Sequence, residues 1–132
     1  MQTEYILIGI GALLVLLVLY PTIRIRTDKN IRNIGGAEAA SLVGSTKNLV
    51  IIDVRTKEEF RSGHIQGAKN IPLGELPSRM GELAKYKGNP LLVHCASGSR
   101  SAKAVLLLSK NGFAPVNHLR GGLSAWPGPL KK

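Results

Sequence analysis

Near its N-terminus the chain carries a stretch without any charge, from Tyr5 to Ile23. A helix of that length spans about 28 Å, close to the hydrocarbon thickness of a bilayer. A buried core helix would normally show a polar face, which this segment lacks. A cleaved signal peptide would have a basic stretch before the apolar run and a small-x-small cleavage site, and neither occurs before Pro21. We therefore expect an uncleaved transmembrane anchor at residues 1–23.

Charge is distributed unequally about this segment. Glu4 precedes it, and four basic residues follow it: Arg24, Arg26, Lys29 and Arg32. The positive-inside rule places such a basic flank in the cytoplasm. We expect a single-pass protein of the inner (cytoplasmic) membrane, with its N-terminus outside and the rest of the chain in the cytoplasm. The flank at residues 24–33 is expected to be a basic linker.

The remainder of the 132-residue chain has room for one compact domain. Its apolar runs are short and continuous, as in strands of a parallel sheet covered on both faces, and helix-forming runs alternate with them. The pattern predicts strands at 49–54, 68–71, 91–93 and 116–119, and helices at 36–43, 57–61, 77–86 and 101–110. Thr56 and Glu59 are expected to form a capping box at the second of these helices. The sequence thus predicts an α/β domain whose site lies at the carboxyl ends of the strands.

The chain has a single cysteine, Cys95, between an apolar run and a helix-forming run. Ser99 or Ser101 is available as the N-cap of the following helix. Backbone N–H groups of such a loop, together with the positive end of the helix dipole, favour a bound anion and lower the pKa of a thiol. Gly98 and its small neighbours let the backbone curl so that these N–H groups converge. Cys95 is therefore a candidate nucleophile in a loop that suits an anionic substrate.

The spacing between this cysteine and the next arginine separates two families that build such loops. Protein tyrosine phosphatases carry His-Cys-x5-Arg around a bound phosphate, whereas the spacing from Cys95 to Arg100 is Cys-x4-Arg. The shorter loop resembles that of rhodanese sulfurtransferases, whose cysteine carries one sulfane sulfur as a persulfide. Other motifs similar to this family are Ile51-Ile52-Asp53-Val54-Arg55, Glu58-Glu59-Phe60, Gly63-His64-Ile65-Gln66-Gly67-Ala68-Lys69-Asn70-Ile71-Pro72, Leu119-Arg120-Gly121-Gly122 and Trp126. The resemblance covers roughly residues 31–128.

The resemblance implies a rhodanese-like three-layer fold for residues 34–128, followed by a tail at 129–132. It also implies that Cys95 is the catalytic residue. The substrate-binding residues would be those of the loop after it: Ala96, Ser97, Gly98, Ser99, Arg100 and Ser101. Within this loop we expect the backbone amides rather than the serine hydroxyls to bind the anion, and the Arg100 guanidinium to hold an anionic donor.

Three further residues are expected to act structurally near the site. Asp53 and Arg55 would form an ion pair that fixes neighbouring loops, and His64 would stabilise a turn. His94 matches the phosphatases only by preceding the cysteine, and His118 lies outside every motif. No group of His, Cys, Asp and Glu has metal-ligand spacing, so we expect neither a metal nor a cofactor.

The formal net charge of +10 does not by itself indicate nucleic-acid binding, because the basic residues are scattered and no nucleic-acid motif accompanies them. Contact with anionic lipid explains the basic flank, and the bilayer is the expected partner of residues 5–23. A lone cysteine excludes an internal disulfide and fits a reducing compartment. Without a resolving cysteine in the chain, a persulfide on Cys95 must pass its sulfur to another molecule.

The leading hypothesis is a membrane-anchored sulfurtransferase. It would take sulfur from a small anionic donor such as thiosulfate and pass it from Cys95 to cyanide or to a thiol, including a protein thiol. One alternative is a non-catalytic rhodanese-like module that recruits a partner to the membrane, although a cysteine within an intact loop counts against it. Another is a cysteine phosphatase or arsenate reductase, which the loop length disfavours.

Overall fold

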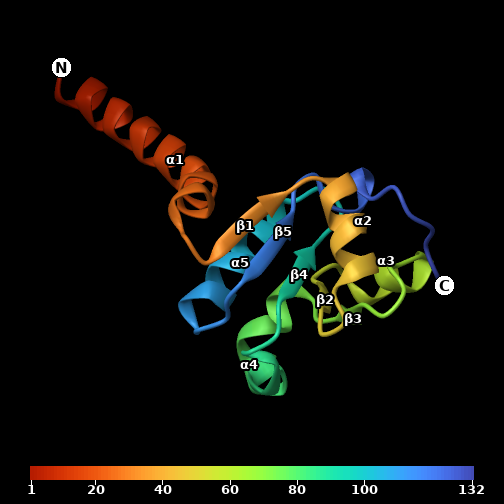
Figure 1. The fold of residues 1–132 in the computed structure, drawn as a ribbon. Coiled ribbons are helices and arrows are strands. Elements are labelled where there is room, and N and C mark those ends of the chain that lie inside the picture. The colour runs from red at the N-terminus through yellow and green to blue at the C-terminus, as the bar shows by residue number, and fades with distance from the viewer.

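Parallel strand pairing organises the domain that follows the N-terminal helix. The computed structural model describes residues 1–132 and contains a five-stranded sheet in the order β1-β5-β4-β2-β3 (Figure 1). All four strand pairs are parallel. The strands are β1 (Ile31–Ile34), β2 (Val50–Asp53), β3 (Lys69–Asn70), β4 (Leu91–His94) and β5 (Val116–Leu119).

One long helix precedes the sheet, and shorter helices connect its strands. They are α1 (Gln2–Thr27), α2 (Gly36–Ser45), α3 (Lys57–Ser62), α4 (Leu76–Leu83) and α5 (Ser99–Lys110), with 3-10 turns at Leu73–Glu75, Ala84–Tyr86 and Gly122–Ala125. Every strand and helix expected from the sequence pattern is present, with ends shifted by a few residues. Thr56 and Glu59 form the expected capping box at α3.

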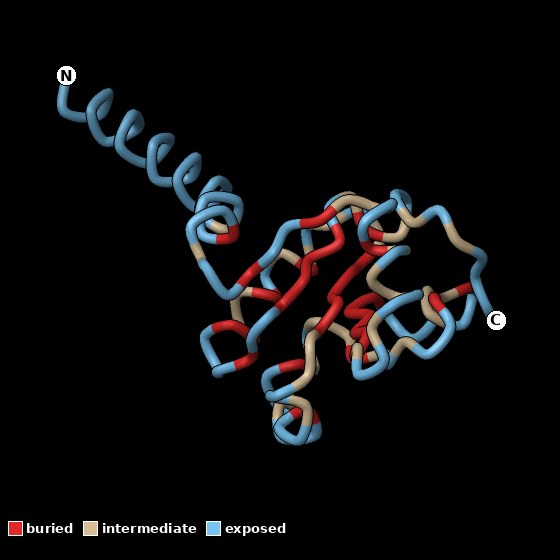
Figure 2. The backbone as a smooth tube through the Cα atoms, in the orientation of Figure 1, coloured by how far each residue is buried: buried red, intermediate tan, exposed pale blue.

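Two apolar cores lie on opposite faces of the sheet, which makes the domain three-layered. The larger core joins the sheet to α4 and α5 through residues such as Leu83 and Leu108. The smaller core joins the other face to α2 through Ala39. Successive strand residues divide between them, with Ile51 in the smaller core and Ile52 in the larger. The central strands β2 and β4 are almost continuously apolar and are buried along their whole length, as Figure 2 shows, because both of their faces are covered.

The first helix projects away from the domain, and its apolar side chains are exposed over most of its length (Figures 1 and 2). It is long and apolar enough to cross a membrane, and none of its most apolar window is buried in the protein. A core helix of a soluble domain would be covered. The exposed surface therefore agrees with the interpretation of residues 5–23 as a membrane anchor.

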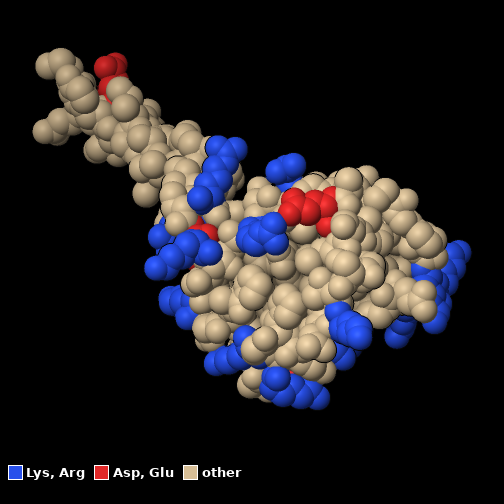
Figure 3. All heavy atoms as spheres, in the orientation of Figure 1, with Lys and Arg blue, Asp and Glu red and all other residues tan.

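The expectation of a linker at residues 24–33 was wrong in its conformation. Helix α1 continues to Thr27, and strand β1 starts at Ile31. Ile25 is 5% exposed and belongs to the larger core, while β1 pairs with β5 at the edge of the sheet. These contacts order the segment. In Figure 3, several Lys and Arg side chains lie where α1 meets the domain, and others are spread over the rest of this face.

The C-terminal tail is also held against the domain. The N–H of His64 donates to the carbonyl of Lys131 at 2.9 Å, and the N–H of Lys131 donates back to His64 at 2.7 Å. This reciprocal pair ties residues 129–132 to the turn that follows α3, so the tail is part of the folded unit rather than a loose end.

Candidate active site

The loop around Cys95 joins the carboxyl end of β4 to the start of α5. The Cys95 sulfur accepts a hydrogen bond from the N–H of Gly98 at 3.0 Å and another from the Ser101 hydroxyl at 3.3 Å. Gly98 has a φ of 110°, a left-handed conformation that favours glycine. This residue lets the chain turn back toward the sulfur.

The helix cap differs from the one expected. Gly98 occupies the N-cap position of α5, and no side chain caps the helix. Neither Ser99 nor Ser101 serves as the cap, because α5 begins earlier than predicted and the Ser101 hydroxyl points back to the sulfur. That hydroxyl is a contact to the thiol that the sequence did not predict.

These contacts favour the thiolate form of Cys95. Burial raises the pKa of the thiol, and four hydrogen bonds oppose it: from the Ser101 hydroxyl and from the N–H groups of Ser101, Gly98 and Ser97. The hydrogen bonds prevail, so the pKa of Cys95 lies below its usual value. A cysteine with a lowered pKa at the carboxyl edge of the sheet is a candidate nucleophile.

The segment that follows β5 is joined to this loop by backbone hydrogen bonds. Leu123 donates its N–H to the carbonyl of Cys95 at 2.8 Å, and Ser124 donates to Ala96 at 3.2 Å. Gly122 packs so closely that a Cβ built on it would lie 2.6 Å from the Cys95 carbonyl oxygen. Gly122 therefore allows this segment to pack closely against the Cys95 loop.

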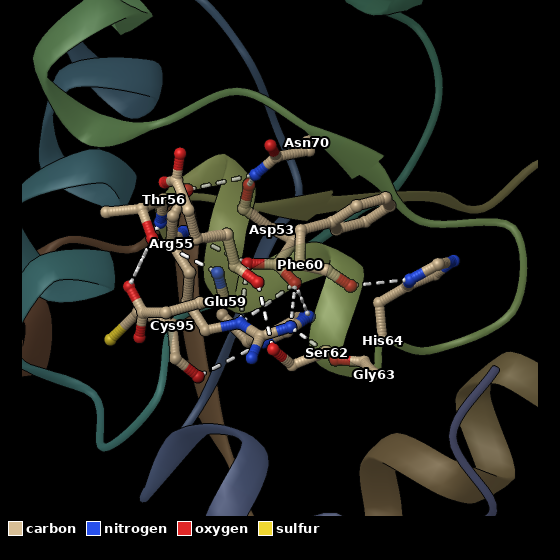
Figure 4. Close-up of polar contacts among 12 residues, drawn as sticks. Asp53, Arg55, Thr56, Glu59, Phe60, Ser62, Gly63, His64, Asn70 and Cys95 are labelled. Atoms are coloured by element: carbon tan, nitrogen blue, oxygen red, sulfur yellow. Dashed lines mark hydrogen bonds and ion pairs between the residues drawn. The ribbon is translucent and has the colours of Figure 1, made fainter. Parts of the chain in front are cut away.

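Asp53 and Arg55 form a buried ion pair beside the loop (Figure 4). Nη2 of Arg55 lies 2.7 Å from Oδ2 of Asp53 and donates a second bond to the carbonyl of Gly63 at 2.8 Å. His64 stacks on Phe60 with ring centroids 3.8 Å apart, and its Nδ1 lies 2.9 Å from the Phe60 carbonyl. In both arrangements the side chains bind neighbouring parts of the chain, as expected for residues with a structural role.

His94 lies at the end of β4 with no exposed surface. Its Nδ1 is 3.2 Å from the Cys95 carbonyl, and its Nε2 is 3.6 Å from Asp53 and has no hydrogen-bond partner. Burial lowers the pKa of His94, although the nearby Asp53 charge opposes this shift. The ring therefore supports the backbone of the loop as a neutral group.

Arg100 is engaged with a carboxylate from another helix. Its Nη1 and Nη2 donate to the two oxygens of Glu59 at 2.7 and 2.9 Å. The hydrogen bond from Arg100 lowers the pKa of Glu59 to about 2. No ion pair was expected for Glu59 from the sequence, and this pairing joins α3 to α5 beside the Cys95 loop. A role for Arg100 in binding a donor stays a prediction.

Two residues outside every motif also reach the site. Nε2 of His118 lies 2.8 Å from the Ser101 hydroxyl, and Nδ1 of His118 lies 2.9 Å from Oδ1 of Asn33. Burial lowers the pKa of His118 to about 4, so the ring is neutral near pH 7. In the parallel register of β4 and β5, His118 lies opposite Val93, just before the Cys95 loop. A correct prediction of this strand pairing would therefore have placed His118 near the site.

Residues 36–128 match the sequence pattern of the Rhodanese-like domain. The chain belongs to the rhodanese-like family. YibN of Escherichia coli is 34% identical over 116 residues, which cover 87% of this chain and 80% of YibN. A sulfurtransferase of Allochromatium vinosum is 31% identical over 96 residues, covering 73% of this chain and 88% of that protein. YqhL of Bacillus subtilis is 42% identical over 81 residues, 61% of this chain, and the match spans only 63% of YqhL.

Solved rhodanese structures share this architecture. The rhodanese-like domain protein from Staphylococcus aureus superposes with a TM-score of 0.68 at 34% identity, covering 76% of this chain and 96% of that one. The thiosulfate sulfurtransferase from Pseudomonas aeruginosa gives a TM-score of 0.69 at 27% identity, covering 81% of this chain and 21% of that one. The expected central parallel sheet flanked by helices is thereby confirmed as the rhodanese-like fold.

Proposed function

We propose that this protein is a membrane-anchored sulfurtransferase that carries sulfane sulfur on Cys95. The observation that supports it most directly is the environment of the Cys95 sulfur, which backbone N–H groups and the Ser101 hydroxyl surround. Relatives that are named sulfurtransferases carry the same domain. The geometry suits a thiolate that attacks sulfur and then bears a persulfide anion in the same nest of donors.

The proposed reaction has two balanced steps. The Cys95 thiolate attacks the outer sulfur of a donor such as thiosulfate, so that a new S–S bond forms while the S–S bond of thiosulfate breaks and sulfite leaves with the electron pair. An acceptor thiolate then attacks the outer sulfur of the persulfide. The S–S bond to Cys95 breaks, and its sulfur leaves as the thiolate, ready for another cycle.

The two alternative functions, an oxyanion-processing enzyme and a recruitment module, place different demands on the Cys95 loop. A phosphatase or arsenate reductase needs a cradle for a larger oxyanion, and the Cys-x4-Arg spacing leaves one residue fewer than the phosphatase pattern. A non-catalytic recruitment module has no need for a cysteine with a lowered pKa. Both features favour sulfur transfer.

We also propose that α1 spans the membrane with the rhodanese domain in the cytoplasm. The exposed apolar surface of α1 and the basic residues just after it support this arrangement. The anchor would keep sulfur transfer beside the bilayer.

The deciding experiment is intact mass spectrometry of the purified full chain after brief exposure to thiosulfate. We expect one added sulfur atom, its removal by cyanide, and no adduct on Cys95→Ser. A phosphatase substrate assayed in parallel covers the main alternative. The absence of any adduct with several sulfur donors would contradict the proposal, and turnover of the phosphatase substrate would then favour phosphatase chemistry.

A further inference from the structure

A cleft of about 620 Å³ lies between the last turns of α1 and the second half of α5. One wall is formed by Tyr20 and Arg24, which share one face of α1, and by Asp28 directly after the helix. The opposite wall is the part of α5 that carries Leu107 and Lys110. The cleft therefore joins the end of the membrane anchor to the helix that begins after the Cys95 loop.

Contacts between the anchor and the domain fix the position of this cleft. Ile25 is buried in the larger core, and the Ser109 hydroxyl donates to Oδ2 of Asp28 at 2.7 Å. The domain is therefore held against the end of α1 rather than attached by a free tether. Arg24 is the first charged residue after the charge-free stretch at residues 5–23. With that stretch across a bilayer, the cleft lies at the level of the lipid headgroups.

The cleft carries more positive than negative charge. Arg24 and Lys110 line opposite walls, and neither forms an ion pair. Asp28 is the one carboxylate in the cleft, and both of its oxygens are engaged. Its Oδ1 accepts from the N–H of Asn30 at 2.9 Å, and its Oδ2 accepts from the Ser109 hydroxyl. The two basic side chains are therefore available to an anion.

Apolar side chains form another part of the cleft. Tyr20 is 58% exposed on α1, and Leu106 and Leu107 are half-buried on α5. An exposed tyrosine at the end of a membrane-spanning helix is typical of the bilayer interface, where its ring meets acyl chains and its hydroxyl meets headgroups. The cleft thus offers basic groups to a phosphate and an apolar surface to the first part of an acyl chain.

We propose that this cleft binds one anionic phospholipid of the cytoplasmic leaflet, with its phosphate between Arg24 and Lys110 and its upper acyl chains against Tyr20 and Leu107. This inference rests on the proposed membrane span and orientation of α1, and it is independent of the sulfur chemistry. Basic pockets beside membrane helices on the cytoplasmic side suit phospholipid headgroups, and the volume of the cleft lies within the range of ligand sites, roughly 300–1,000 Å³.

The bound lipid would attach the domain itself to the membrane surface. Lys110 lies at the end of α5, and the Cys95 loop lies at the start of the same helix. A lipid that contacts both α1 and α5 therefore holds this helix, and with it the Cys95 loop, in one orientation to the bilayer.

Native mass spectrometry of the full chain in an uncharged detergent, titrated with phosphatidylglycerol, tests this assignment. We expect one bound lipid, and weaker binding of phosphatidylcholine because its choline group offsets the charge of the phosphate. Arg24→Gln and Lys110→Gln should each raise the dissociation constant by about tenfold or more, the effect of losing one charge-assisted hydrogen bond. Arg26→Gln is the matched control, because it removes the same charge from the same end of α1 but Arg26 does not line the cleft. This variant should bind the lipid as the parent does.

Two results of the titration would overturn the assignment. They are equal affinity of the parent for the two lipids and equal weakening by all three substitutions, since either would indicate no specific site for an anionic lipid. Glycerol 3-phosphate, which has no acyl chains, is the competitor that distinguishes a lipid from a soluble phosphate. Displacement of the lipid by an equal concentration of this compound would overturn the choice of a lipid.

Carbonate extraction of cell membranes tests the anchor separately. A chain that stays in the membrane fraction but binds no phosphatidylglycerol would overturn only the assignment of the cleft. Release of the chain by carbonate would overturn the membrane span and the cleft assignment with it. Because neither measurement forms a persulfide, failure of sulfur transfer is a separate result.

Discussion

At the scale of single residues, the reactivity of Cys95 depends on a few hydrogen bonds that oppose the effect of burial. Removing the hydroxyl in Ser101→Ala should raise the pKa of Cys95 by about one to two units, because a hydrogen bond to a charged group contributes about 1.5–3 kcal/mol. The ultraviolet absorbance of the thiolate, followed against pH, measures this shift. Ser97→Ala is the matched control, since its N–H rather than its hydroxyl faces the sulfur. An unchanged pKa in Ser101→Ala would contradict the assigned contact.

Gly122 is a second residue whose identity is set by close packing. A methyl group in Gly122→Ala would meet the carbonyls of Cys95 and Ala96, with contacts of 2.6 and 2.7 Å, so the catalytic loop must move. We expect a loss of about 1–3 kcal/mol in the free energy of unfolding, together with slower alkylation of Cys95. Urea unfolding and iodoacetamide kinetics check both effects. Gly44→Ala in α2, where a Cβ meets nothing within 4 Å, should not destabilise the protein.

His118 should make the protein sensitive to acid. Its pKa is about 4 in the folded protein and about 6.5 in the unfolded chain, so the unfolded chain binds a proton first as pH falls. The full contribution to stability is present above pH 6.5, and about 3 kcal/mol is lost by pH 4. His118→Gln lacks this component, so its free energy of unfolding should fall less over that range than that of the parent. Equal pH dependence of the two proteins would refute this role.

At the scale of secondary structure elements, the Glu59–Arg100 pair joins α3 to α5, the helix that begins directly after the Cys95 loop. We expect Arg100→Ala to raise the donor KM by about tenfold or more, the effect of one charge-assisted hydrogen bond, with little change in kcat. Steady-state kinetics with thiosulfate measures the split between the two constants. Arg79→Ala removes a comparable ion pair from α4 and serves as the control. An unchanged KM in Arg100→Ala would exclude this side chain from donor binding.

Elements differed in how well the sequence predicted them. The central strands were predictable because short, continuous apolar runs in a small α/β domain are typical of strands that are buried on both faces. Strand β1 was missed because Arg32 and Asn33 interrupt its apolar character, and an edge strand is stabilised by its pairing rather than by its composition. The ordered end of α1 was missed for a similar reason, since Ile25 is buried only by contact with the domain.

At the scale of the whole molecule, a long apolar helix carries the rhodanese domain at one end (Figure 1). If the domain is cytoplasmic, protease added to intact cells should leave it undigested, whereas protease added after lysis should degrade it. A C-terminal reporter fused to the full chain should show the same protection. Digestion of the domain in intact cells would contradict the proposed orientation. It would not bear on the proposed sulfur transfer.

The sequence by itself determined the membrane-length helix, the alternation of strands and helices, and the cysteine loop. Each of these depends on residues close together in the chain, where periodicity, hydrogen-bonding geometry and glycine placement are local properties. Only the tertiary structure decided which distant residues surround that loop. His118 meets Asn33, 85 residues away, because β1 pairs with β5, and Arg100 meets Glu59 because β2 and β4 are neighbours. Ile25 likewise packs the end of α1 into the larger core, a contact that no local pattern specifies.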